Sequence, residues 1–173
     1  SRGLGDVYKR QTEDVAKRIE EINLPKIKTV MYAKGHYYLY KKKNPFNHLI
    51  YPLPNSNGHG IHAGMDIENN LRFGPNAKWV DSIEYSFDDN TLDEFCNSIK
   101  SYWINFDPSC LTPDYTGIRS KIVAEGEGSQ DFEILDASDH GLENLIHLQG
   151  IDSPGLTSSL SIAAEVMSKL GIH

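Results

Sequence analysis

Two side chains in this sequence have the chemistry needed to handle an acidic substrate. His62 ends the run Gly58-His59-Gly60-Ile61-His62, and histidine, with a reference pKa of about 6.5, accepts a proton near neutral pH. Arg119 lies in Gly117-Ile118-Arg119, and its planar guanidinium fits a carboxylate with two hydrogen bonds. The alternatives are a structural histidine and an ordinary ion pair with one of the 24 acidic residues. We take His62 as a candidate base and Arg119 as a candidate carboxylate-binding residue.

A third candidate is the loop at residues 150–158, which lies between an expected strand and an expected helix. The apolar run 145–148 predicts a short buried strand, and Gly171 marks a helix end. Backbone amides at the positive end of a helix attract a phosphate, a carboxylate or an electron-rich ring oxygen. The alternative is a tight turn beneath a packing helix. One face of the expected helix is apolar, with Leu156, Leu160, Ala163, Met167 and Leu170.

The elements that must position these residues are mostly strands. Residues 28–32 and 36–40 predict a hairpin through Ala33-Lys34-Gly35. Further strands are expected at 48–51, at 58–66, where glycine suggests a close approach, and at 131–134. Thr91 and Glu94 form a capping-box pattern before an amphipathic helix at 91–103. The fold class predicted is α+β, with a mixed, largely antiparallel sheet from residues 28 to 135 and flanking helices.

Composition excludes several classes of function. The net charge of −7 over 173 residues argues against a nucleic-acid partner, which needs clustered basic residues. No apolar run reaches the roughly 18 residues of a membrane span. His59, His62 and Asp66 lack a second set of ligands, so no metal site is expected. Two cysteines and no secretory signal favour a cytoplasmic location, with peripheral membrane attachment of a longer parent as an alternative.

Several runs, in order along the chain, resemble one known family. The run 150–163, Gly-Ile-Asp-Ser-Pro-Gly-Leu-Thr-Ser-Ser-Leu-Ser-Ile-Ala, is similar to the last segment of FAD-dependent oxidoreductases of the D-amino acid oxidase superfamily. The similarity is greatest to the branch that contains L-2-hydroxyglutarate dehydrogenase, where Glu often stands at the position of Asp152. The Gly-x-His run ending at His62, the Phe-Gly-Pro-Asn of residues 73–76, and the Asp-Phe-Glu-Ile of 131–134 also match. The run 115–121, Tyr-Thr-Gly-Ile-Arg-Ser-Lys, resembles the family's Tyr-Ala-Gly-Ile-Arg-Pro-Lys, with Ser120 at the position where proline is usual.

The resemblance implies a flavoenzyme that oxidises a small 2-hydroxy acid and passes electrons to an acceptor such as a quinone. It places His62 as the base and Arg119 on the carboxylate. The flavin ring would lie against the closing loop, at Gly150, Ser153, Pro154, Gly155, Leu156, Thr157 and Ser158. An FAD-dependent amino acid or amine oxidase, and a non-catalytic domain binding a carboxylate or a protein partner, remain alternatives.

The family's nucleotide-binding turn, Gly-x-Gly-x-x-Gly after a strand, does not occur in this sequence. We therefore expect a C-terminal part of a longer enzyme, inactive by itself. Residues 1–11 lack Met and resemble a translated sequencing adapter, which predicts a non-native leader. Residues 12–142 are then expected to form a substrate domain with a flanking helix, and residues 143–173 the FAD-contact segment. The C-terminal strand and helix should lie apart from the main sheet, with the apolar face of the helix poorly covered.

Overall fold

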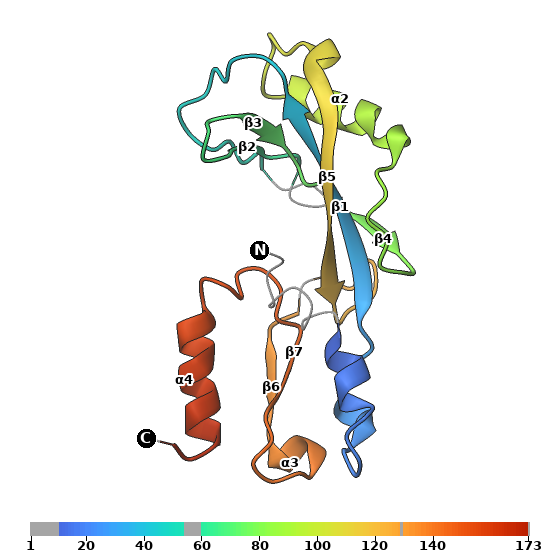
Figure 1. Cartoon of the computed structure of the whole chain (residues 1–173), viewed down its shortest axis with the longest axis vertical. Coiled ribbons are helices and arrows are strands. Elements are labelled where there is room, and N and C mark those ends of the chain that lie inside the picture. Colours follow the sequence, from blue (N-terminus) through green and yellow to red (C-terminus); the bar gives the residue numbers. More distant parts are fainter. Residues whose placement is uncertain (1–10, 54–59, 129, 173) are drawn as a thin grey trace. The chain divides into compact units, whose positions relative to one another are not determined.

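The protein divides into two compact units, seen in a computed structural model that describes residues 11–53, 60–128 and 130–172 (Figure 1). One unit is Ala33–Ile118, and the other combines Ser1–Tyr32 with Arg119–His173. The proposed segments 1–11, 12–142 and 143–173 concern roles in a longer protein and stay a prediction.

A five-stranded sheet is the largest element of regular structure. Its strands have the order β2-β3-β1-β4, and β5 also pairs with β1. The pairs β1–β3 and β2–β3 are antiparallel, with Tyr38 opposite Phe73 and Gly64 opposite Arg72. Helices accompany the sheet, so the predicted α+β class is confirmed. The strands are β1 (Met31–Tyr40), β2 (Ala63–Met65), β3 (Leu71–Phe73), β4 (Lys78–Val80) and β5 (Leu111–Lys121).

The main hydrophobic core lies between this sheet and helix α2 (Leu92–Lys100). Phe95 and Ile99 on α2 are completely buried. Phe73 on β3 is also completely buried, and Tyr38 on β1 is 2% exposed. The helix predicted at 91–103 is therefore confirmed, with a short 3-10 turn, η2 (Asp89–Thr91), before it. Two other short turns are η1 (Leu24–Lys26) and η3 (Pro108–Cys110), and a helical stretch occupies 11–16.

The predicted hairpin at 28–40 is wrong, because β1 runs without a break from Met31 to Tyr40. Gly35, which the local pattern indicates as a turn residue, lies inside the strand. A Cβ placed on Gly35 would be 2.8 Å from the Cβ of Pro75 and 3.2 Å from the Asn76 carbonyl oxygen. Glycine therefore serves close packing here and not chain reversal.

Three other local expectations need correction. The strand expected at 48–51 is reduced to a single bridge between Ile50 and Ala63. The strand expected at 58–66 begins only at Ala63, and residues 58 and 59 lie outside the described part of the chain. Thr91 makes no side-chain cap for α2. Its hydroxyl donates to the Asp88 carbonyl oxygen at 2.9 Å and meets the hydroxyl of Tyr38, so burial against β1 outweighs capping.

The Phe-Gly-Pro-Asn run at 73–76 holds β1 in place. The Asn76 side-chain oxygen accepts a hydrogen bond from the His36 backbone amide and lies 2.9 Å from the ring nitrogen Nδ1 of His36. The Asn76 amide group donates to Glu94 on α2 at 2.9 Å. Gly74 has φ +136°, and a Cβ there would lie 2.5 Å from the His36 carbonyl oxygen. This motif thus joins β1, the turn and α2.

The second unit contains a separate antiparallel pair, β6 (Glu133–Leu135) and β7 (His147–Gln149), followed by helix α4 (Ser159–Lys169) (Figure 1). The predicted strand, loop and helix are confirmed in that order. Gly171 adopts φ +68° after the helix, as its position predicts. None of the residues of α4 is buried, and Leu160 is 85% exposed. The predicted poor coverage of its apolar face is therefore also confirmed.

Two histidines are buried close to this small sheet. His140 ends helix α3 (Ala137–His140), and its Nδ1 accepts a hydrogen bond from the Leu142 amide at 3.3 Å. His147 begins β7. The Nε2 atoms of both rings are buried without a hydrogen-bond partner among the described residues. Burial, and then the neighbouring His140, lower the pKa of His147 below its ordinary value.

The lowered pKa of His147 predicts how the stability of the second unit changes in acid. Above about pH 6.5 His147 is neutral in both the folded and unfolded chain. As the pH falls below that value the unfolded chain binds the proton first, so the free energy of unfolding should decrease. An NMR titration of the His147 ring, assigned by its loss in His147→Gln, should give a midpoint below that of a free histidine. A midpoint at or above the free value would contradict this account.

Candidate functional site

His62 precedes β2 and is turned away from the core. Its neighbours Ile61 and Ala63 are 3% and 1% exposed, whereas His62 itself is half-buried, as expected from the alternation along an extended chain. The His62 carbonyl oxygen accepts a hydrogen bond from the Gly74 amide at 3.0 Å. Its ring contacts the ring of Tyr51 edge to face, with centroids 4.4 Å apart. His62 is therefore presented on the outer face of an anchored strand.

Arg119 lies near the end of β5 and is half-buried. Within the described part of the chain no carboxylate pairs with it, unlike Arg72, which binds both Asp66 and Asp114 at 2.6 Å. The alternative of an intramolecular ion pair thus finds no support among these residues. The Ser120 that replaces the family's proline does not produce a turn, because β5 continues to Lys121.

The loop at 150–158 is attached to the end of β5. Lys121 forms an ion pair with Asp152 of the loop. Gly150 has φ +71°, and a Cβ there would lie 2.5 Å from the Cδ1 of Ile122. Because side chains two residues apart leave a strand on the same face, Arg119 shares the face from which Lys121 reaches the loop. The loop is thus attached through Lys121 and Ile122 at the end of the strand that also carries Arg119.

The loop keeps part of its backbone available for a ligand. The Gly155 amide donates to the Asp152 carbonyl oxygen at 2.6 Å and the Ser158 amide to that of Pro154 at 3.1 Å. No described residue accepts from the amides of Leu156 or Thr157. The Leu156 side chain is 84% exposed beside them. Unpaired amides next to an apolar side chain, just before an 11-residue helix, suit a flat ring with electron-rich oxygens.

The candidate residues are divided between the two compact units. Arg119 and the loop residues belong to one unit, and His62 belongs to the other. The assignment of His62, Arg119 and residues 150–158 to a single site therefore stays a prediction. Sequence reasoning did not single out Lys121 and Tyr51. The two-residue spacing from Arg119 could have indicated Lys121, whereas nothing in the local pattern indicates that Tyr51 contacts His62.

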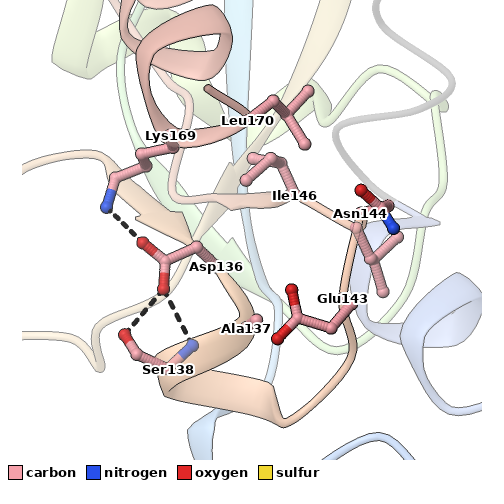
Figure 2. Close-up of a pocket in the computed structure, with 9 residues that line it drawn as sticks. Asp136, Ala137, Ser138, Glu143, Asn144, Ile146, Lys169 and Leu170 are labelled. Atoms are coloured by element: carbon pink, nitrogen blue, oxygen red, sulfur yellow. Dashed lines mark hydrogen bonds and ion pairs between the residues drawn. The ribbon is translucent and has the colours of Figure 1, made fainter. Parts of the chain in front are cut away.

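A separate pocket of about 370 Å³ lies between α3 and the end of α4 (Figure 2). Asp136 caps α3, accepting from the Ser138 amide at 2.9 Å, and pairs with Lys169 at 2.7 Å. The hydrogen bond from Lys169, followed by those from Ser138, holds the pKa of Asp136 well below its usual range. These groups already satisfy one another, and the lining contains none of the predicted site residues. The pocket is best explained as the junction that fastens α4 to α3.

The described residues hold neither a cluster of metal-binding side chains nor a membrane-spanning helix. No group of three or more His, Cys, Asp or Glu side chains in those residues is placed to hold a metal ion, and His59 lies outside them. Asp66, which was weighed as a metal ligand, instead binds Arg72 and accepts hydrogen bonds from Asn70. None of the described helices combines the length and the apolar character that crossing a membrane requires.

Several characterised proteins are similar to this chain in sequence. A mitochondrial L-2-hydroxyglutarate dehydrogenase from Arabidopsis thaliana is 32% identical over 98% of the chain and 36% of its own length. A glycerol 3-phosphate oxidase from Mycoplasma genitalium is 30% identical over 80% of the chain, again 36% of its own length. The chain thus spans little more than a third of these relatives.

The fold also matches a solved structure. A dithionite-reduced L-alpha-glycerophosphate oxidase from Mycoplasma pneumoniae, with FAD bound, superposes with a TM-score of 0.73 over 95% of the chain and 41% of its own length. Sequence identity in that superposition is 17%, so it supports the fold. The family described as FAD dependent oxidoreductase (DAO) matches residues 15–169, nearly the whole described chain. The chain therefore belongs to this family of FAD-dependent oxidoreductases.

Proposed function

We propose that this chain is the substrate-binding and flavin-closing part of a dehydrogenase that oxidises a 2-hydroxy acid resembling L-2-hydroxyglutarate. The observation that carries the proposal is the 32% identity to an L-2-hydroxyglutarate dehydrogenase across 98% of the chain. The half-buried Arg119 adds to it, because a guanidinium that no carboxylate of the described residues neutralises is suited to a substrate carboxylate.

Oxidation of a 2-hydroxy acid removes a hydride from carbon and a proton from the hydroxyl group. FAD, when bound, would supply the acceptor for the hydride. His62 receives the hydroxyl proton, for which a neutral imidazole on an outward face is suited. Arg119 binds the substrate carboxylate through two N–H groups and so fixes the orientation of the reacting carbon. Lys121 is held by Asp152 and keeps the loop against β5.

The loop residues fit the flavin that the family uses. The amides of Leu156 and Thr157, just before the positive end of α4, would hold the flavin by donating to its electron-rich oxygen atoms. Gly150, Ser153, Pro154, Gly155 and Ser158 form the turn that presents these amides.

Glycerol 3-phosphate is the second candidate substrate. Besides the Mycoplasma oxidase, a glycerol 3-phosphate dehydrogenase from Caloramator mitchellensis is 29% identical over 79% of the chain. Arg119 fits a phosphate as well as a carboxylate. Both glycerol 3-phosphate relatives match the chain with lower identity and over a smaller part of it than the plant L-2-hydroxyglutarate dehydrogenase does, so glycerol 3-phosphate is the second candidate.

The partners and location of the whole protein belong to the same proposal. The reduced flavin needs an acceptor, for which a quinone is our candidate. We propose a cytoplasmic location for the whole protein. The alternative is a mitochondrial location, because the plant relative is named as a mitochondrial enzyme.

The roles of His62 and Arg119 predict separable kinetic losses in the flavin-loaded parent enzyme. His62→Asn should lower kcat/KM by about 10²- to 10⁴-fold, the contribution of a general base. Arg119→Met should mainly raise KM for the hydroxy acid, and Arg119→Lys should restore only part of the binding. Steady-state assays with a dye acceptor, comparing L-2-hydroxyglutarate with glycerol 3-phosphate, measure both effects.

Matched controls are His48→Asn and Arg18→Met, since His48 and Arg18 are exposed and lie outside the candidate site. Full turnover by His62→Asn would contradict the base assignment. A preference of the wild-type parent for glycerol 3-phosphate would replace the proposed substrate with the second candidate.

The 173-residue chain alone should neither retain FAD nor oxidise a hydroxy acid. A few amide contacts, each contributing about 0.5–1.5 kcal/mol net, do not offset an association cost of about 4–15 kcal/mol. Most of the affinity should come from contacts to the adenine, ribose and pyrophosphate made elsewhere in the longer protein. A visible spectrum of the purified chain tests this, and a yellow protein with stoichiometric flavin would contradict it.

A further inference from the structure

The backbone between Ile50 and Ala63 determines which side chain meets His62. Ile50 and Ala63 exchange both backbone hydrogen bonds, each 3.0 Å from nitrogen to oxygen, in an antiparallel bridge. The next opposed pair is therefore Tyr51 with His62. In an antiparallel ladder such a pair has no hydrogen bonds between its own backbones, and its side chains lie closer together than those of the flanking pairs.

Burial confirms that this pair occupies the outer face. Ile61 and Ala63 are buried towards the core, and Ile50 packs against it. Tyr51 is 64% exposed on the opposite face. Its ring is nearly perpendicular to that of His62, at 87°, with centroids 4.4 Å apart. Such an edge-to-face contact limits rotation of the imidazole about its side-chain bonds.

The strand that carries His62 is itself fixed on both sides of the histidine. The hydroxyl of Tyr102 donates to the Ile61 carbonyl oxygen at 2.9 Å, and burial raises the pKa of Tyr102, so this donor stays protonated. The Gly74 amide donates to the His62 carbonyl oxygen at 3.0 Å. With the backbone held in this way, the contact with Tyr51 acts on the orientation of the His62 ring.

We propose that Tyr51 is a positioning residue for His62, fixing the plane of the imidazole through its aromatic ring and not through its hydroxyl. This inference rests on the proposed function, in which His62 accepts the proton of the substrate hydroxyl. A base must lie within hydrogen-bond reach of that proton, so a freely rotating ring spends less time in the productive orientation.

The contact itself is tested in the 173-residue chain without flavin. The NMR shifts of the His62 ring protons should carry the ring-current effect of Tyr51. Tyr51→Phe should preserve these shifts, and Tyr51→Leu should move them towards the values of a free histidine. Leu49→Ala is the matched control, because Leu49 lies on the same exposed face but opposite Gly64. Unchanged His62 shifts in Tyr51→Leu would overturn the contact.

The effect on turnover is tested in the flavin-loaded parent. Tyr51→Leu should lower kcat about tenfold with KM nearly unchanged, whereas Tyr51→Phe should retain the wild-type kcat and KM. If His62→Asn abolishes turnover while Tyr51→Leu does not alter it, the positioning role is overturned and the proposed function stands. If His62→Asn turns over normally, the base assignment fails independently of Tyr51. Equal losses in Tyr51→Phe and Tyr51→Leu would transfer the role to the hydroxyl and overturn the proposal.

Discussion

The large sheet depends on the close approach between β1 and the turn at 74–76. At Gly35 and Gly74 a side chain would come within 2.8 Å of Pro75 and 2.5 Å of the His36 carbonyl oxygen. Asn76 then satisfies the His36 amide and reaches Glu94 on α2. The two glycines allow the approach and the asparagine satisfies the polar groups that it buries, as buried backbone donors require. β3 and α2 are thereby fixed against the same strand, and the core forms between them.

This constraint explains where the sequence was a poor guide. The hairpin at 28–40 was predicted because Gly35 follows a lysine between two β-rich runs, yet Gly35 is required by a neighbour 40 residues away. The capping box predicted at Thr91 does not form for a similar reason. The Thr91 hydroxyl is hydrogen-bonded to the Tyr38 hydroxyl and to the Asp88 carbonyl oxygen, which are tertiary or neighbouring partners and not the start of α2. Local patterns do not reveal such tertiary partners. The predictions that rested on a periodic pattern of apolar residues, those of α2 and α4, were confirmed. So was the helix end predicted at Gly171, where a glycine adopts a positive φ.

The same distinction applies to the candidate site. Residue types and family motifs could single out His62, Arg119 and the loop, because each lies in a short recognisable run. They could not show that Arg119 has no internal carboxylate partner among the described residues, nor that Lys121 pairs with Asp152. They also could not show that Tyr51 faces His62, which follows from the register of one isolated bridge. Register is a property of paired segments, and residues 50 and 63 are joined only by folding.

The C-terminal helix combines two surfaces with different requirements. At its start, the amides of Leu156 and Thr157 have no partner among the described residues, and along its length Leu160 and Met167 remain exposed. Full burial of an exposed leucine is worth about 1.5–3 kcal/mol, so the apolar face is a large unused source of stabilisation. The loop is nevertheless anchored firmly, by Lys121 to Asp152 and by the packing of Gly150 against Ile122. The start of α4 is thus held through its loop, and its end is held by the ion pair of Lys169 with Asp136 at 2.7 Å, while its apolar face contributes little to the packing.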